Sequence, residues 1–351
     1  MTELKELITQ ASSLRTSDIH LTVGLPPVFR IDGVLTPQGN APLTEADVRS
    51  VAEALCAEEH LQELEGCGET DLALTYEGFR MRLNVFRQQG HTALVARMLP
   101  LRVPTAKELM IPDVLIAQAE KPRGLILVTG PTGSGKSSTL AALLDHVNRT
   151  RPRHIITLEA PIEYVHVPQK CVVNQREVGV DTESFASGLR AALRQDPDVI
   201  LVGEMRDLET ISTAITAAET GHLVFGTLHT KGAPNTVNRI IDVFPVAQQG
   251  QIRTQLADVL ECVVSQALLP KIGGGRRAVH EIMLGTPAVR SLIRQEKTFQ
   301  IAGTMQTAKN QGMQLLDDAL LRLVRTKQVS AEDALAAATD PDALRTQIMR
   351  A

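Results

Sequence analysis

An eight-residue glycine-rich run, GPTGSGKS at residues 130–137, constrains this chain more than any other feature. It follows an apolar run that predicts a strand over 125–129 and precedes the helical pattern SSTLAALLDHV. Glycines at such a junction let backbone N–H groups face phosphate oxygens, while the lysine reaches the β- and γ-phosphates and the serine ligates Mg²⁺. We therefore expect ATP and Mg²⁺ as cofactors, rather than a structural glycine-rich turn. The expected binding residues are Gly130, Pro131, Thr132, Gly133, Ser134, Gly135, Lys136, Ser137 and Ser138.

Strand and helix patterns alternate on both sides of this run. The apolar runs GLILVTG, HIITLE, DVILVG and HLVFGTLH are typical of buried strands. Helical patterns lie between them at residues 136–149, 183–194 and 208–219. Such alternation predicts an α/β fold with a mostly parallel sheet covered by helices. Beyond about residue 235 the pattern is mainly helical.

The chain before residue 100 has a different organisation, and 351 residues exceed the usual length of one domain. It opens with a helical pattern over 2–14, and short β-type runs with a hairpin follow over 18–35. A helix from Thr44 to Leu64, capped by Thr44 with Asp47, and three more strands complete an α+β pattern. A proline-punctuated stretch then predicts a hinge. The predicted division is a small domain over 1–100, a linker over 101–112 and an ATPase domain over 113–351.

Hydrolysis also requires a carboxylate near the metal and a group that positions water. In DVILVGE, residues 198–204, four apolar residues predict a buried strand, and Glu204 follows its carboxyl end. Ligands of open α/β sheets bind at that edge. We therefore expect Glu204 to act with Ser137 at Mg²⁺; the alternative is a solvated acidic residue that merely follows a strand.

The segment TLEAPIE at 157–163 offers the second carboxylate, because it follows the adjacent predicted strand. Pro161 fixes a turn there, so that Glu159 and Glu163 can both face the phosphate end of the sheet. We favour Glu163 as the base that polarises the attacking water. The sequence separates the two carboxylates only weakly, and a structural salt bridge stays open for either.

Two histidines and several arginines complete the candidates. His229 follows the carboxyl end of another apolar run and is expected to sense the γ-phosphate, while His222 at the amino end would serve packing or an interface. Charge on a transferred phosphoryl group is often met by an arginine of a neighbouring subunit. Arg190 and Arg194 lie one helical turn apart before Asp198 and are the preferred candidates, unless they are ordinary surface charges. Further candidates in the small domain are Arg82, Arg87 and Arg97.

Composition excludes several partners. The net charge is −4, and the chain has no Trp, two Tyr and seven Phe, which disfavours nucleic-acid binding through a basic field or aromatic stacking. No apolar run approaches the roughly 18 residues that span a bilayer, so we expect a cytoplasmic protein without direct membrane insertion. The four cysteines form no C-x-x-C pair and predict neither a zinc site nor a disulfide framework.

Together these motifs resemble the secretion-type hexameric ATPases of type IV pilus and type II secretion systems. The match comprises GPTGSGKS, ITLEAPIEYVH, RAALRQDPDVILVGEMRD and TGHLVFGTLHT, in the family's order; SDIHLTVGLPPVFRIDG and FRMRLNVFRQ extend it to the small domain. The resemblance implies a PAS-like small domain before a RecA-like P-loop ATPase domain with a helical C-terminal portion. It also implies a homohexamer, recruited to the cytoplasmic face of the inner membrane, with a pilus platform protein as partner.

Within that family the chain is similar to the retraction branch, which drives twitching motility. The features are TPAVRSLIRQ at 286–295, GMQLLDDAL at 312–320, and the absence of both a C-x-x-C pair and a longer N-terminal region. One position departs from the family: its Asp box reads E-D-P-I-E, whereas this chain has Ala160. An assembly or type II secretion ATPase and a slow, accessory, nucleotide-gated retraction paralogue stay open as alternatives. A DNA-translocating helicase is disfavoured by the charge and aromatic counts.

Overall fold

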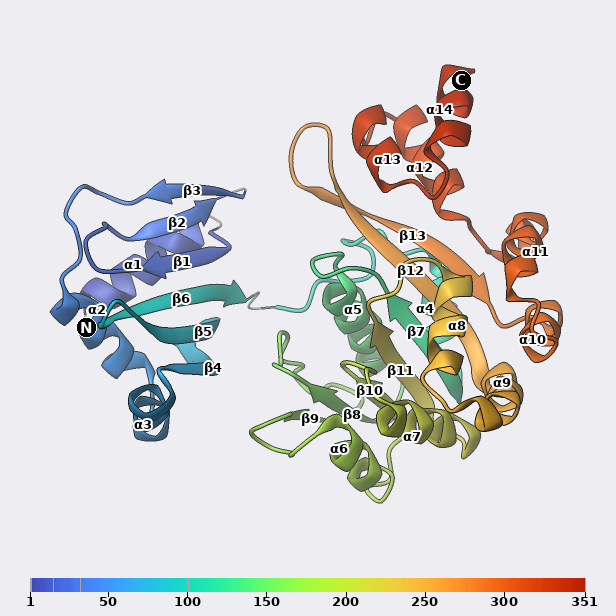
Figure 1. Cartoon of the computed structure of the whole chain (residues 1–351), viewed down its shortest axis with the longest axis horizontal. Coiled ribbons are helices and arrows are strands. Elements are labelled where there is room, and N and C mark those ends of the chain that lie inside the picture. Colours follow the sequence, from blue (N-terminus) through green and yellow to red (C-terminus); the bar gives the residue numbers. More distant parts are fainter. Residues whose placement is uncertain (1, 15, 32, 100–101, 351) are drawn as a thin grey trace. The chain divides into compact units, whose positions relative to one another are not determined.

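The computed structural model describes residues 2–14, 16–31, 33–99 and 102–350. Contacts divide the chain into two compact units (Figure 1). The first comprises Met1–Arg102 with Pro161–Val165, and the second comprises Val103–Ala160 with His166–Ala351. The domain limits at 100 and 112 stay predictions. Ala106 and Ile111, from the proline-punctuated stretch, are buried in the core of the second unit.

The first unit is a six-stranded antiparallel sheet in the order β3-β2-β1-β6-β5-β4, packed against helices. Alternation in β5 turns Met81, Leu83 and Val85 inward, where they meet Ile8 of α1 and Val48 of α2. The strands are β1 (Asp18–Leu21), β2 (Val28–Ile31), β3 (Val34–Pro37), β4 (Glu69–Tyr76), β5 (Phe79–Gln88) and β6 (His91–Leu99). The helices are α1 (Thr2–Ser13), α2 (Glu45–Leu55) and α3 (Glu58–Cys67).

One detail of this unit differs from the sequence prediction, and two agree with it. The single helix predicted from Thr44 to Leu64 is broken after Leu55 into α2 and α3. The cap is confirmed, because the Asp47 backbone N–H donates to the Thr44 hydroxyl and the Asp47 carboxylate accepts from the Thr44 N–H. The hairpin predicted over 18–35 is also confirmed, because β3 pairs antiparallel with β2 from Ile31 and Val34 onward; Asp32 of its turn lies outside the described residues.

The second unit contains a seven-stranded sheet in the order β13-β12-β7-β11-β10-β8-β9, parallel except for β13 (Figure 1). Its strands are β7 (Gly124–Thr129), β8 (His154–Glu159), β9 (Val172–Glu177), β10 (Val199–Val202), β11 (Leu223–Leu228), β12 (Leu260–Pro270) and β13 (Arg276–Leu284). Strands β7, β10 and β11 are buried throughout because helices cover both faces, which explains their continuous apolar runs.

Alternate residues of β7 belong to two cores on opposite faces of this sheet. Leu125 and Leu127 pack with residues of α6–α10, whereas Ile126 and Val128 pack with α4 and α5. These helices are α4 (Asp113–Ala119), α5 (Lys136–Thr150), α6 (Phe185–Ala192), α7 (Leu208–Glu219), α8 (Ala233–Asp242), α9 (Val246–Val259) and α10 (Pro287–Arg294). The chain ends with α11 (Ile301–Thr307), α12 (Leu316–Arg325), α13 (Ala331–Ala337) and α14 (Pro341–Met349). Among the described residues, no helix is long and apolar enough to cross a membrane.

The prediction of a mainly helical chain after residue 235 missed the hairpin of β12 and β13. Their apolar runs resemble buried helix segments, and periodicity alone does not separate the two. Strand β12 pairs parallel with β7, which is the strand that leads into the glycine-rich run. Strand β9 was also not predicted. Because it lies at the edge of the sheet and is partly exposed, its sequence has few apolar residues.

Candidate functional site

The glycine-rich run joins β7 to α5 at the carboxyl edge of the parallel sheet. Gly130 and Gly135 have φ angles of 140° and 88°, which side chains with a Cβ rarely adopt. Gly135 is also the N-cap of α5 and makes no side-chain cap to the first N–H groups of the helix, the groups that bind anions at helix N-termini. The local geometry is that of a phosphate cradle, as the sequence predicts.

Lys136 lies over this loop. Its Nζ atom donates to the carbonyl oxygens of Gly130, at 2.8 Å, and Pro131, at 3.1 Å. Ser134 is buried, and its N–H donates to the Pro131 carbonyl at 3.2 Å. Ser137, the predicted Mg²⁺ ligand, is exposed on the first turn of α5. The charged amine and the serine hydroxyl thus lie on the same short turn of chain.

Strands β10 and β11 bring two predicted residues together. His229 Nε2 lies 2.6 Å from Glu204 Oε1, and Arg206 forms an ion pair with the same oxygen. The two strands are adjacent and parallel, so the loops that follow them leave the sheet at the same edge. The Glu204 side chain is 19% exposed and that of His229 is 47% exposed. The sequence predicted both residues for this edge, but not their hydrogen bond.

The hydrogen bond between Glu204 and His229 leads to a testable prediction about the Mg²⁺ dependence of ATP hydrolysis. We expect Glu204→Gln to lower the maximal ATPase rate about 10- to 100-fold and to raise the Mg²⁺ concentration for half-maximal rate, because the amide carries no charge for the metal. We expect His229→Gln to have a smaller effect of the same kind, because it changes a hydrogen-bond partner of Glu204 but leaves the carboxylate in place. Magnesium titrations of the two variants and the parent measure this; equal Mg²⁺ dependence in all three proteins would contradict it.

The two candidate base residues have different surroundings. Glu159 Oε1 accepts hydrogen bonds from the Thr157 hydroxyl, at 2.6 Å, and from Gln175 Nε2, at 3.0 Å. Gln175 in turn accepts the His166 N–H at 2.7 Å, so Glu159 belongs to a network that fastens β8 to β9 and to the next loop. These contacts give Glu159 a structural role and leave the catalytic assignment of Glu163 as our proposal.

Glu163 lies in the segment 161–165, which packs with the first unit. Within that unit, the Arg80 guanidinium on β5 donates to the Ile162 carbonyl through Nε, at 3.3 Å, and through a terminal nitrogen, at 3.1 Å. Arg80 was not predicted as a site residue, because a single arginine on a strand has no distinguishing sequence pattern. Ala160, immediately before the segment, is exposed and leaves room for a larger side chain.

The candidate arginines make contacts away from the phosphate loop. Arg190 on α6 forms an ion pair with Glu209 of α7, and Arg194 donates to the Arg190 carbonyl at 3.1 Å. Helix α6 ends at Ala192, two residues short of Arg194, so the predicted helix to 194 was too long. These contacts are exposed to solvent and therefore weak, so either arginine can give up its partner for another group. A role of these arginines at the site of a neighbouring subunit stays our proposal.

The alternative arginines and the second histidine are also engaged. Arg82 faces Asp71 at 3.8 Å and Arg97 faces Asp18 at 2.9 Å, both within the first unit. His222 Nδ1 lies 2.8 Å from the Ala217 carbonyl at the end of α7. The packing alternative for His222 fits this contact, because the ring closes the carboxyl end of the helix.

Two polar side chains that no motif predicts hold the loop that follows His229. Ser265 of β12 and Glu281 of β13 are paired across the hairpin and share one face. The Ser265 hydroxyl accepts the Gly232 N–H at 2.9 Å, and Glu281 Oε1 accepts the Ala233 N–H at 2.7 Å. Burial raises the pKa of the Glu281 carboxyl. The only sequence signal was polar residues within apolar runs.

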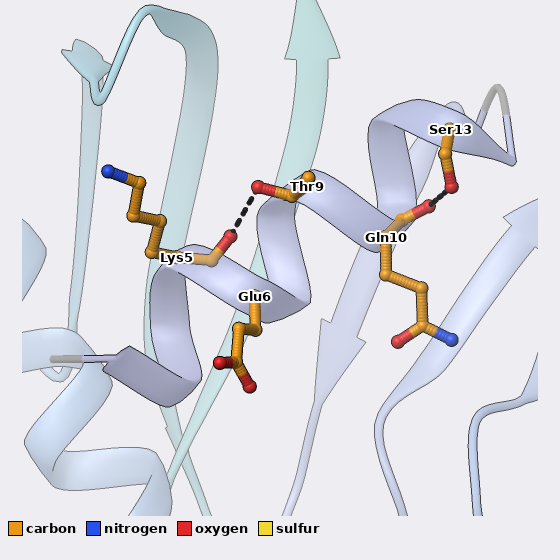
Figure 2. Close-up of a pocket in the computed structure, with 5 residues that line it drawn as sticks. All are labelled: Lys5, Glu6, Thr9, Gln10 and Ser13. Carbon is orange, nitrogen blue, oxygen red and sulfur yellow. Dashed lines mark hydrogen bonds between the residues drawn. The ribbon is translucent and has the colours of Figure 1, made fainter.

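A separate shallow pocket lies on α1 of the first unit (Figure 2). In Figure 2, the Thr9 hydroxyl donates to the Lys5 carbonyl, at 2.7 Å, and the Ser13 hydroxyl to the Gln10 carbonyl, at 2.8 Å. Its lining contains none of the predicted site residues. The lining residues are Lys5, Glu6, Thr9, Gln10 and Ser13.

Comparisons with known proteins agree with this geometry. The model of the family described as type II/IV secretion system protein matches residues 2–274. The chain is 48% identical over 341 residues to the type IV pilus retraction ATPase PilT of Pseudomonas aeruginosa, covering 97% of this chain and 99% of that protein. It is 38% identical over 348 residues to the type IV pilus ATPase PilU of the same organism, covering 99% and 91%.

A solved structure gives the same result for the fold. The crystal structure of the pilus retraction motor PilT with bound ADP matches with a TM-score of 0.91 at 48% identity, covering 97% of this chain and 98% of that one. The predicted fold, a small α+β domain followed by a RecA-like domain, is confirmed by this match. The similarity inferred from four motifs extends over nearly the whole chain.

Proposed function

Since the chain belongs to the type II/IV secretion system protein family, we propose that it is an ATP-hydrolysing motor that drives type IV pilus retraction and thereby twitching motility. The observation that carries the proposal is the phosphate loop with Lys136 at the sheet edge where Glu204 and His229 meet. The near full-length similarity to a pilus retraction ATPase supports the direction of movement.

Mg²⁺ fits the oxygen groups at this edge. The ion prefers hard oxygen ligands, usually takes one or two from the protein, and completes its shell with water and phosphate oxygens. We propose that the Ser137 hydroxyl and the Glu204 carboxylate serve it, Glu204 directly or through water. Bound Mg²⁺ would neutralise charge on the β- and γ-phosphates.

The remaining roles follow from the chemistry of phosphoryl transfer. Backbone N–H groups of residues 132–138 bind the phosphates, and Lys136 exchanges its two carbonyl partners for phosphate oxygens. Glu163 accepts a proton from the attacking water as the water oxygen bonds to the γ-phosphorus. The bond between the γ-phosphorus and the bridging oxygen breaks in the same step, and ADP leaves with that oxygen. His229 orients Glu204 through their hydrogen bond and senses whether the γ-phosphate is present.

We further propose a homohexamer that works against an inner-membrane pilus platform protein, at the cytoplasmic face of that membrane. Arg190 and Arg194 are the arginines that we assign to the neighbouring subunit's phosphates, because the exposed ion pair of Arg190 and the exposed hydrogen bond of Arg194 are weak enough to be exchanged. Sedimentation of the purified protein with and without nucleotide measures the assembly. A monomer under both conditions would exclude this part of the proposal.

A second candidate, a slow accessory retraction paralogue, is favoured by Ala160. Because Ala160 is exposed, Ala160→Asp should fold normally and restore the family's acidic pair with Glu159. If the parent is a working motor, we expect this variant to change the steady-state ATPase rate by less than about threefold and to leave twitching intact in a strain without the native gene. If the protein is instead a slow accessory paralogue, we expect the parent not to hydrolyse ATP and the Ala160→Asp variant to hydrolyse it.

A further inference from the structure

One buried side chain of another strand forms hydrogen bonds to the phosphate loop and to the helix that follows it. Gln266 on β12 is 3% exposed. Its Nε2 atom donates to the Ser134 carbonyl at 2.7 Å, and its Oε1 atom accepts the Thr139 hydroxyl at 2.8 Å. Ser134 lies in the glycine-rich run and Thr139 on the first turns of α5, so one amide fastens both ends of the turn that holds Lys136.

Two glycines of the loop lie close to Gln266. A Cβ atom on Gly130 would lie 2.3 Å from the main-chain carbonyl oxygen of Gln266, and one on Gly135 would lie 2.8 Å from the side-chain Nε2 atom. A Cβ on Gly133 meets no atom within 4 Å. Two of the three glycines therefore permit close approach to β12 as well as to phosphate.

A residue on the opposite face of β12 holds the loop that follows His229. Ser265 precedes Gln266, and successive residues of a strand point to opposite faces. Ser265 accepts the Gly232 N–H after His229, while Gln266 holds the phosphate loop. Strand β12 thus fixes both loops from beneath, although neither Ser265 nor Gln266 belongs to a nucleotide-binding motif.

We propose that Gln266 is a positioning residue that holds the phosphate loop, before nucleotide binds, in the conformation that receives ATP. The inference rests on the proposed function, since it assigns the amide a role in nucleotide affinity. Without this clamp, the buried Ser134 carbonyl and Thr139 hydroxyl lose their partner, and the loop populates other conformations. Apparent affinity then falls in proportion to the receptive fraction, while ATP binding itself restores the loop.

The test is nucleotide binding and steady-state kinetics of Gln266→Leu. The dissociation constant of a fluorescent ADP analogue and the KM for ATP should both rise about 10-fold, which corresponds to a receptive fraction of about a tenth. The kcat at saturating ATP should stay within about threefold of the parent. A generally destabilised protein would instead lose kcat in proportion to its unfolded fraction, with KM unchanged.

Matched variants keep the test decisive if Gln266→Leu folds poorly. Thr139→Val removes the partner hydroxyl and should raise KM in the same way, whereas Thr139→Ser keeps the hydroxyl and should restore the parent's value. Gln314→Leu is the control, because that glutamine also donates to a backbone carbonyl, of His280 at 2.6 Å, without contacting the loop. It should leave ATP affinity unchanged.

The outcomes separate this inference from the function it rests on. If the parent binds and hydrolyses ATP but Gln266→Leu and Thr139→Val keep the parent's KM, the positioning role is wrong and the proposed function stands. If the parent neither binds nor hydrolyses ATP, the proposed function fails first. An equal rise in KM for Gln314→Leu would overturn the role of this one amide and indicate general loosening.

Discussion

Lys136→Ala will abolish ATP hydrolysis and weaken nucleotide binding by about 100-fold or more. The lysine amine now donates to two loop carbonyls and is placed to transfer these hydrogen bonds to phosphate oxygens. Charge-assisted hydrogen bonds contribute about 1.5–3 kcal/mol each, and two such losses correspond to at least a 100-fold change in affinity. Titration of a fluorescent nucleotide and release of inorganic phosphate measure the two effects.

A second lysine supplies the control for this prediction. Lys170 is exposed, and its backbone N–H donates to the Asn148 carbonyl, which an alanine preserves. We expect Lys170→Ala to retain the parent's affinity and rate. Nucleotide binding at the parent's level in Lys136→Ala would remove the phosphate loop from the proposed mechanism, whatever the loop's sequence.

Glu163→Gln will lower the hydrolysis rate about 10²- to 10⁴-fold while nucleotide affinity stays within a few-fold of the parent. A general base contributes a factor of this size, and the amide keeps the shape of the side chain without accepting a proton. The split between rate and affinity distinguishes it from Lys136→Ala. Single-turnover hydrolysis with a saturating excess of protein measures the chemical step directly.

Glu159→Gln is the matched comparison for this assignment. Glu159 already accepts hydrogen bonds from Thr157 and Gln175 through one oxygen, and an amide oxygen can still accept both, although more weakly than a carboxylate. We therefore expect a rate loss below about tenfold, with a lowered unfolding temperature. If Glu159→Gln were the variant with the large loss of rate and Glu163→Gln were active, the base would have to be reassigned to Glu159.

Local features of this chain could be predicted from its sequence. The phosphate loop was predicted because all its groups lie within eight contiguous residues between a strand and a helix, so no long-range contact has to be guessed. The same holds for the Thr44 cap, which is decided within one turn of helix. Glu204 and His229 were assigned to the correct edge because each follows the carboxyl end of an apolar strand.

The contacts between these local features depend on the order of the strands in the sheet. Apolar periodicity does not specify that order. The Glu204–His229 hydrogen bond exists because β10 and β11 are neighbours, and the clamp by Gln266 exists because β12 lies beside β7. Buried strands have interchangeable apolar sequences, so their neighbours are chosen by packing of the whole sheet.

The sequence alone therefore determined the chemistry of this protein: a phosphate loop, a following carboxylate and the α/β class that places them at one edge. Tertiary structure decided which side chains hold that chemistry in place. Gln266 contacts Ser134 across 132 residues of chain, and Arg80 contacts Ile162 across 82. Closing such long loops is opposed by chain entropy and is stabilised only by the complete core, which no local pattern contains.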